Sequence, residues 1–226
     1  QWGESFEETC DQRISVVSGD VSADGLGLSD LDRRLFISAD VIIHSAATVS
    51  FDSPLDSSIE INLLGPNRIV QLLNEEAVTP HLIAVSTCYV AGNRRGAANE
   101  ELLAGTPFQV KVDWRAEVDA ARRTRSDLDA RSRVPEELKR FGKGAREELG
   151  AAGLPMLAAK TEQLREAWVN DQMVEAGRSR ATSLGWPDVY TYSKALGETE
   201  LIELHGEIPI SIVRPSIIES AWEQPA

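Results

Sequence analysis

A tyrosine and a lysine four residues apart, Tyr190 and Lys194, have the types and the spacing for acid–base chemistry. On a helix, such a pair lies on one face about one turn apart. A free phenol, with a pKa of about 10, holds its proton too tightly for fast transfer at neutral pH. A neighbouring ammonium lowers that pKa, because it favours the phenolate. We therefore predict that Tyr190 is a general acid for a carbonyl oxygen that receives a hydride.

The pair alone is weak evidence, because aromatic–lysine packing pairs are common on surface helices. The surrounding sequence is more informative. The apolar run at residues 81–86 leads into the hydroxyls of Ser86 and Thr87. A hydroxyl at the carboxyl end of a parallel strand lies where ligands of open α/β sheets bind. This context favours a catalytic interpretation of Tyr190 and Lys194.

Apolar runs and helical spacing alternate along much of the chain. We predict strands at residues 14–18, 41–44, 81–86 and 208–213, and helices at residues 31–37 and 59–76. Alternation of strands and helices is the order of a doubly wound parallel sheet, so the predicted fold class is α/β.

Residues 99–185 break this alternation. They are rich in Ala, Arg, Glu and Leu, and we predict several helices with breaks at Pro135 and at residues 153–155. An insertion of this size exceeds ordinary connections between strands, so we expect it to have a role of its own. The predicted organisation is a sheet domain built from residues 1–98 and 186–226, with a helical insertion at residues 99–185.

The composition excludes several classes of protein. Hydrophobic residues make up 42% and charged residues 26% of the chain, as in ordinary soluble proteins, and no apolar run could cross a bilayer. The two cysteines, Cys10 and Cys88, imply no disulfide framework, and the three histidines lack metal-ligand spacing. We therefore predict a cytoplasmic protein without a bound metal. Because the chain begins at Gln1 without a methionine, we expect an internal portion of a longer protein.

The net charge of −13 is distributed unevenly. Residues 1–60 carry twelve acidic and three basic side chains, whereas residues 111–146 carry eleven basic and seven acidic ones. A strongly acidic chain is a poor nucleic-acid ligand, because neutralising phosphates requires a basic surface. The basic segment favours a solvated helical face with many ion pairs. Attraction of an anionic ligand, or peripheral contact with a membrane surface, is the alternative.

Six blocks of sequence resemble, in chain order, those of the extended short-chain dehydrogenases/reductases. In detail they are most similar to the fatty acyl-CoA reductase branch, the male sterility family. The blocks are residues 19–22 (GDVS), 40–52 (DVIIHSAATVSFD), 61–65 (INLLG), 85–92 (VSTCYVAG), 190–198 (YTYSKALGE) and 212–218 (IVRPSII). The resemblance covers about residues 14–98 and 186–222. It implies a Rossmann-like domain, and we expect its first strand and its Gly-rich, pyrophosphate-binding turn to lie upstream of residue 1.

The resemblance implies catalytic roles for five side chains. Thr87 hydrogen-bonds the substrate carbonyl oxygen, with Ser86 beside it as the less favoured candidate. Tyr190 donates the proton, while Lys194 holds the nicotinamide ribose and lowers the pKa of the phenol. Asn62 lies on the helix that supports a proton relay through water.

The same resemblance implies a binding site for NADPH. Asp20 and Val21 are expected to contact the adenine ring, and Pro215 and Ser216 the nicotinamide carboxamide. The small side chains of Ala46 and Ala47 would let the protein backbone approach the cofactor. Thr87, Tyr190 and Lys194 of the catalytic group complete the expected site.

The implied function is NADPH-dependent reduction of a long-chain fatty acyl-CoA to a fatty aldehyde, a fatty alcohol or both. Terminal thioester reductase domains share this geometry but act on an acyl chain bound to a carrier protein. A non-catalytic NAD(P)-binding scaffold is a third possibility, disfavoured because Tyr190 and Lys194 are both present. A covalent route through Cys88 is disfavoured too, because nothing in the sequence supplies an activating base. The expected role of Cys88 is that of a small buried residue.

Overall fold

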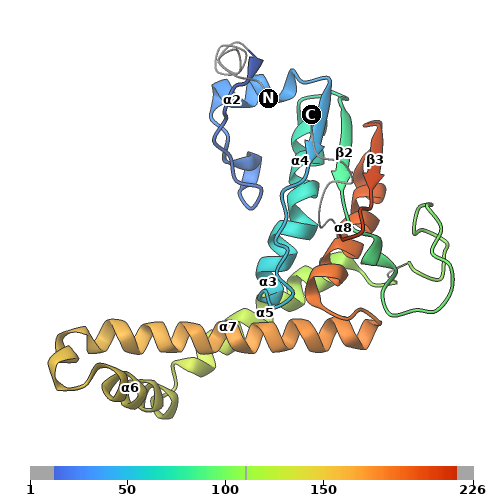
Figure 1. The fold of residues 1–226 in the computed structure, drawn as a ribbon. Coiled ribbons are helices and arrows are strands. Elements are labelled where there is room, and N and C mark those ends of the chain that lie inside the picture. Colours follow the sequence, from blue (N-terminus) through green and yellow to red (C-terminus); the bar gives the residue numbers. More distant parts are fainter. Residues whose placement is uncertain (1–12, 110, 218–226) are drawn as a thin grey trace, which may run out of the picture.

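The computed structural model describes residues 13–109 and 111–217 of the chain. Within these residues, three short strands form one parallel sheet. In spatial order they are β1 (Val41–His44), β2 (His81–Val85) and β3 (Ile210–Val213) (Figure 1). The three strands predicted for these segments are confirmed, and so is the parallel α/β fold class.

The strand predicted at residues 14–18 is wrong. This segment has no ladder partner among residues 13–109 and 111–217, and its side chains are largely exposed, Val16 to 94%. An isolated strand leaves its backbone groups unpaired, so apolar residues alone do not produce one. The apolar side chains of residues 14–18 would suit a strand. Whether a neighbouring strand is present to pair with them depends on the whole fold and cannot be inferred from this segment.

A helical stretch with a π-helical turn inside it joins β1 to β2. It consists of α3 (Leu55–Ser58), the π turn η2 (Ile59–Leu63) and α4 (Leu64–Glu75). The helix predicted at residues 59–76 is therefore confirmed, and helical structure begins one turn earlier. A π turn disturbs the regular helical ladder and is frequent at functional sites. Here it carries Asn62, which is buried.

Shorter elements flank the sheet. The predicted helix at residues 31–37 is confirmed as α2 (Asp30–Ile37). Its N-cap is Ser29, whose hydroxyl accepts a hydrogen bond from the amide of Asp32 at 3.2 Å. The 3-10 turn η1 (Asp24–Gly27) precedes α2, and the 3-10 helix η3 (Cys88–Ala91) follows β2.

Residues 99–185 are largely helical, as predicted. They contain α5 (Trp114–Ser132), α6 (Pro135–Leu149), the 3-10 helix η4 (Ala151–Met156) and α7 (Leu157–Leu184). Pro135 begins α6, a position where the N–H that proline lacks would have no helical partner. Both predicted breaks are thus present. Figure 1 shows α7 passing below the sheet. Helix α6 packs against the end of α7 that is distant from the sheet, so the two helices form an extended arm.

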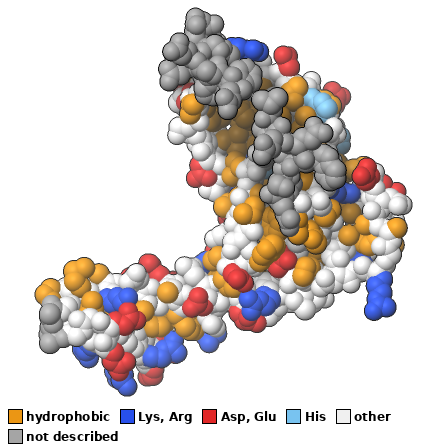
Figure 2. All heavy atoms as spheres, in the orientation of Figure 1, with side chains coloured by type: hydrophobic (Ala, Val, Ile, Leu, Met, Phe, Trp, Pro, Cys, Tyr) orange, Lys and Arg blue, Asp and Glu red, His pale blue; other side chains and the backbone are white. Residues whose placement is uncertain are grey.

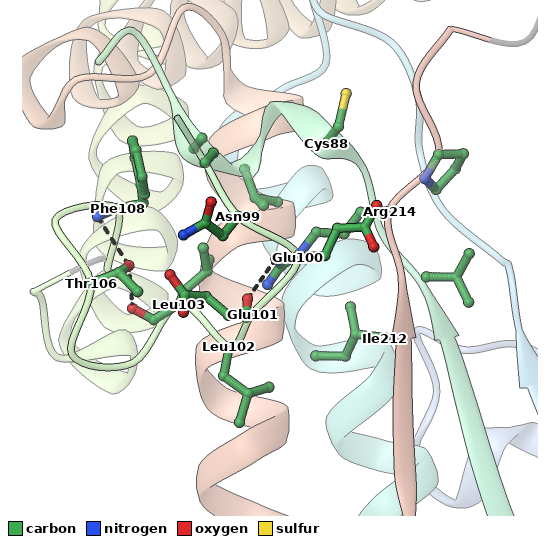
Figure 3. A pocket seen from close by; sticks show the side chains of 15 residues that line it. Cys88, Asn99, Glu100, Glu101, Leu102, Leu103, Thr106, Phe108, Ile212 and Arg214 are labelled. Carbon is green, nitrogen blue, oxygen red and sulfur yellow. Dashed lines mark hydrogen bonds between the residues drawn. The ribbon is translucent and has the colours of Figure 1, made fainter. Parts of the chain in front are cut away.

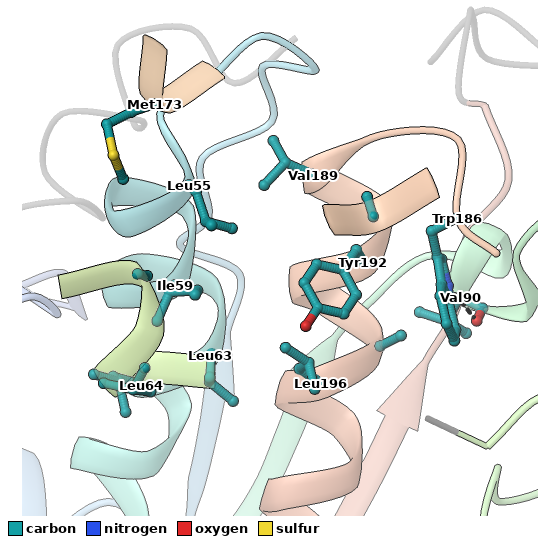
Figure 4. Close-up of a cluster of buried hydrophobic side chains, with 14 of the residues drawn as sticks. Leu55, Ile59, Leu63, Leu64, Val90, Met173, Trp186, Val189, Tyr192 and Leu196 are labelled. Carbon is teal, nitrogen blue, oxygen red and sulfur yellow. Dashed lines mark hydrogen bonds between the residues drawn. The ribbon is translucent and has the colours of Figure 1, made fainter. Parts of the chain in front are cut away.

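Helix α8 (Val189–Leu204) contributes to both clusters of buried apolar side chains in the described part of the chain. The first cluster lies among α5, α7, η2 and the start of α8, and it includes Tyr192 and Leu196 (Figure 4). The second lies between the sheet and α4, and it includes Leu82 of β2 and Leu201 of α8. Helix α8 therefore connects the core of the sheet to the core of the insertion.

Ion pairs between the insertion and the segment after β1 explain the uneven charge distribution. They join Asp52 to Arg178 at 3.0 Å, Asp56 to Arg125 at 2.7 Å and Glu60 to Arg122 at 2.6 Å. Figure 2 shows further acidic and basic side chains interspersed along the arm. The interpretation of the basic segment at residues 111–146 as an ion-paired helical face is confirmed for Arg122 and Arg125. Partly exposed pairs contribute about 0–1 kcal/mol each. They therefore add little stability, and their main effect is to specify which face of the insertion packs against the segment after β1.

We expect Gly197→Ala to destabilise the fold. Gly197 lies where α8 meets η2, and a Cβ there would come 2.4 Å from the carbonyl oxygen of Asn62. The helix would have to move, at a cost of about 1–3 kcal/mol, which outweighs the gain in helix propensity. Gly142→Ala in α6 is the matched control, because its Cβ would meet Thr161 at 4.0 Å. Chemical denaturation should leave the control at or above wild-type stability, and equal stability of the two variants would contradict the close packing.

Candidate active site

The carboxyl ends of the parallel strands lie at one edge of the sheet, and the loops that follow them carry most of the predicted site. Ala46 and Ala47 follow β1, Ser86 and Thr87 follow β2, and Pro215 and Ser216 follow β3. The last two loops are joined, because the amide of Cys88 donates to the carbonyl of Pro215 at 3.1 Å. Ligands of open α/β sheets bind at this edge.

Thr87 and Tyr190 meet at this edge. Thr87 is buried, and its hydroxyl caps η3 by accepting a hydrogen bond from the amide of Tyr89 at 3.3 Å. Tyr190 lies in the first turn of α8, which Asp188 caps by accepting from the amide of Thr191 at 2.8 Å. The Thr87 hydroxyl is close enough to the phenol to affect its pKa. Two hydroxyl groups thus lie together at the end of β2, as the site hypothesis requires.

The pKa of Tyr190 lies above the ordinary value of a tyrosine. Burial has the largest effect and the carboxylate of Asp188 adds to it, while the Thr87 hydroxyl acts in the opposite direction. The lowering of this pKa predicted from the spacing of Tyr190 and Lys194 is therefore wrong for this structure. At neutral pH the phenol is protonated, which is the form that can donate a proton.

Lys194 directs its ammonium to the backbone of β2. The group is buried and donates to the carbonyl oxygen of Val85 at 2.6 Å. Burial lowers the pKa of Lys194, and the carboxylate of Glu198 raises it again in part. An ammonium has three N–H donors, so two remain for a further ligand at the end of the sheet.

Asn62 uses its side-chain amide within the protein. Its Oδ1 accepts from the amide of Thr48 and its Nδ2 donates to the carbonyl of Thr48, both at 3.0 Å. The Nδ2 also donates to the hydroxyl of Ser193 at 2.9 Å. Asn62 therefore ties the loop after β1 to α8, next to Lys194. Its role in a proton relay stays a prediction.

Two buried polar atoms at this edge have no hydrogen-bond partner among the described residues. They are Nε2 of His44, the last residue of β1, and Oγ of Ser86, which follows β2. Buried polar groups are nearly always paired, so both atoms are available to a ligand. Together with the ammonium of Lys194 they form a set of donors and acceptors that fits the hydroxyls of a ribose. The residues present therefore fit a nicotinamide dinucleotide.

Asp20 and Val21 lie in a separate turn. Asp20 is exposed and accepts hydrogen bonds from the amide and the hydroxyl of Ser22, at 2.7 and 2.6 Å. The carbonyl of Val21 accepts from Arg68 of α4 at 3.2 Å. Within the described residues, no hydrogen bond links either residue to the Thr87–Tyr190 pair. Their contact with an adenine ring stays a prediction.

Phe51 is a neighbour of Tyr190 that the sequence does not reveal. The two rings are in edge-to-face contact, with centroids 5.9 Å apart and planes at 74°. This arrangement is favourable for aromatic rings. The contact arises from the fold, because no sequence spacing relates the loop after β1 to the first turn of α8.

A buried polar cluster joins α8 to the insertion. The Tyr192 hydroxyl donates to Glu117 of α5 at 2.7 Å, and Arg180 of α7 donates to the same carboxylate at 2.9 Å. Burial raises the pKa of Glu117, but the hydrogen bonds from Arg180 and Tyr192 bring it below the ordinary value. Tyr192 therefore anchors α8 to the insertion, while Tyr190, two residues earlier, faces the site.

A cavity of about 820 Å³ adjoins the site between β3 and the loop at residues 98–108 (Figure 3). Its lining includes Cys88 and, from that loop, the apolar side chains of Leu103 and Phe108. Cys88 is exposed, so the prediction that it is a small buried residue is wrong.

Among the described residues, no group of three or more His, Cys, Asp or Glu side chains could hold a metal ion. None of the described helices is both long enough and apolar enough to pass through a bilayer.

The parallel sheet, with polar side chains at its carboxyl edge, is that of a Rossmann-like α/β domain. The sequence model of the male sterility protein family matches residues 1–225, and the chain belongs to this family. The family resemblance of the six sequence blocks is thereby confirmed.

Two of the relatives that the chain resembles are fatty acyl-CoA reductases of plants. The alcohol-forming fatty acyl-CoA reductase of Simmondsia chinensis is 28% identical over 99% of this chain and 40% of its own length. The chloroplastic fatty acyl-CoA reductase 2 of Arabidopsis thaliana is 30% identical over 99% of this chain and 32% of its own length. The chain thus spans less than half of these relatives.

A solved structure shares the fold. It is the crystal structure of the terminal R domain from the myxalamid PKS-NRPS biosynthetic pathway, with a TM-score of 0.50 and 19% identity. The match covers 93% of this chain and 35% of that one. It supports the Rossmann-like α/β assignment.

We expect His44 to make the fold less stable as the pH falls from 6.5 to about 4. Burial, together with the nearby ammonium of Lys194, lowers the pKa of His44 from 6.5 to about 4. Between these values the unfolded chain binds a proton that the folded chain excludes, so up to about 3 kcal/mol of stability is lost. Urea unfolding at a series of pH values should show a smaller loss for His44→Asn than for the wild type. Parallel pH profiles would contradict this account.

We expect Tyr192→Phe to lower the free energy of unfolding by about 1–3 kcal/mol, because it removes a hydrogen bond from a buried carboxylate. Tyr89→Phe is the matched control. Its ring is exposed, so the change should stay within about 0.5 kcal/mol. Thermal unfolding followed by circular dichroism measures both, and an unchanged midpoint for Tyr192→Phe would contradict an anchoring role.

Proposed function

We propose that the protein containing this chain uses NADPH to reduce the thioester of a long-chain fatty acyl-CoA. The observation that carries the proposal is the proximity of the Thr87 hydroxyl to the Tyr190 phenol at the end of β2, where the buried Lys194 ammonium is held by the Val85 carbonyl. The substrate class is supported by the relatives, which are named fatty acyl-CoA reductases. Residues 1–98 and 186–226 would form the cofactor-binding domain, and residues 99–185 the insertion.

Several groups of residues would hold different parts of the cofactor. Lys194 would donate to the ribose hydroxyls, with Ser86 and His44 within reach as further polar partners. The small side chains of Ala46 and Ala47 would let the protein backbone approach the cofactor closely. The remaining contacts would be Asp20 and Val21 with the adenine ring and Pro215 and Ser216 with the carboxamide. When bound, the nicotinamide supplies a hydride.

Thr87 and Tyr190 would bind the carbonyl oxygen of the thioester. Negative charge develops on this oxygen as the carbonyl carbon gains a hydride, and preorganised hydroxyl donors stabilise that charge. Tyr190, which is protonated at neutral pH, transfers its proton to the oxygen. The hemithioacetal then breaks its C–S bond, and the hydroxyl proton leaves as coenzyme A departs as the thiol. The product of this step is a fatty aldehyde, and a second round at the same residues would give the alcohol.

We expect Tyr190→Phe to lower kcat/KM for NADPH oxidation with palmitoyl-CoA by about 100- to 10,000-fold, the usual contribution of a general acid. Tyr192→Phe, on the same helix, is the control and should keep its activity at a temperature where it is folded. Gas chromatography of the products counts the hydrides transferred, because it separates aldehyde from alcohol. Equal rates for wild type and Tyr190→Phe would refute the acid role.

The same assay separates the alternatives. A palmitoyl group on the phosphopantetheine arm of an acyl carrier protein replaces palmitoyl-CoA in a parallel reaction. Faster reduction of the carrier-bound chain would favour a carrier-dependent thioester reductase. Binding of NADPH without reduction of either thioester would favour a non-catalytic scaffold. Replacement of NADPH by NADH tests the cofactor preference.

A further inference from the structure

The loop after β1 holds two exposed apolar side chains, one of which contacts Tyr190. Val49 is 67% exposed and Phe51 is 62% exposed. The ring of Phe51 touches the ring of Tyr190, as described above. Isolated apolar residues on a surface are ordinary. Phe51 differs, because its ring adjoins the group that would protonate the substrate, and Val49 lies two residues before it in the same loop.

The loop that carries them is held at several points. Asn62 binds both backbone groups of Thr48 at 3.0 Å, and the hydroxyls of Thr48 and Ser53 lie 2.9 Å apart across the loop. The carboxylate of Asp52 pairs with Arg178 of α7 at 3.0 Å. Val49 and Phe51 are therefore exposed to solvent although the backbone of their loop is held in place by the rest of the fold.

The charges near this surface favour an uncharged ligand group. Asp52 is the neighbour of Phe51 in the chain, and the carboxylate of Asp188 is close enough to raise the pKa of Tyr190. The Lys194 ammonium is buried against the Val85 carbonyl. The guanidinium of Arg178 is already paired with Asp52 and Glu175, so these groups offer a polyphosphate no unpaired cation. An alkyl chain would meet Phe51 and Val49.

We propose that Phe51, together with Val49, is the surface that contacts the alkyl chain of the acyl substrate and so selects for long chains. The inference rests on the proposed function, and it assigns the acyl side of the thioester to the loop after β1. An alkyl chain lying over this surface removes apolar area of both partners from water. Because each buried methylene adds to the favourable free energy, the contact discriminates long chains from short ones.

The test measures kcat/KM of the full-length protein for butyryl-CoA, octanoyl-CoA and palmitoyl-CoA. Phe51→Ala should lower the value for palmitoyl-CoA by about tenfold and the value for butyryl-CoA by less than about twofold. Phe51→Leu, which keeps most of the apolar surface, should restore most of the preference. Leu35→Ala on α2 is the control, because it removes a similarly exposed apolar side chain elsewhere. Unchanged thermal unfolding of all variants shows that the fold is intact.

Three results would overturn the inference while leaving the proposed function intact. Equal losses for all chain lengths would show that Phe51 acts by positioning Tyr190. A raised KM for NADPH with an unchanged chain-length profile would place the cofactor against Phe51. An unchanged profile with unchanged KM values would show that the ring contacts no ligand. If the wild type oxidises NADPH with none of the three thioesters, the proposed function fails, and this inference fails with it.

Discussion

The close approach of α8 to the π turn η2 is the constraint on which the rest of the structure depends. The absence of a side chain at Gly197 lets the helix backbone come against the carbonyl of Asn62, and the Asn62 amide then reaches Ser193 on the same helix. This contact sets how far α8 lies from the sheet. It thereby determines that the Lys194 ammonium ends at the carbonyl of β2 and that the phenol of Tyr190 ends beside Thr87.

The helical insertion contributes to the site through the same helix. The hydroxyl of Tyr192 on α8 and the guanidinium of Arg180 on α7 both donate to Glu117 of α5. Arginines of α5 and α7 also pair with acidic residues of the segment between β1 and α4. Each exposed ion pair adds little stability. The buried carboxylate of Glu117 is different, because it needs the donors of Arg180 and Tyr192 to offset its loss of hydration. The uneven charge of the sequence is thus a pattern of complementarity within one chain.

Much of the fold could be predicted from the sequence, because β1, β2 and most helices depend on local apolar patterns and on breaks such as Pro135. The segment at residues 14–18 could not, since a strand requires a partner that its own residues do not specify. At the site, parallel topology was enough to bring Thr87 near α8. The contact of Phe51 with Tyr190 and the raised pKa of that phenol depend on burial and on long-range packing, which no spacing encodes.

The hydrogen bond from Lys194 to the Val85 carbonyl has a consequence for the thermodynamics of ligand capture. A free lysine side chain has about 2 kcal/mol of rotamer entropy to lose when it is immobilised. Here that entropy is lost during folding, since β2 already fixes the ammonium at the end of the sheet. A ligand that takes the two remaining N–H donors therefore meets a preorganised cation, and its affinity is not reduced by ordering the side chain. The immobilisation of Lys194 during folding thus increases the affinity of the site for a ligand that binds its ammonium.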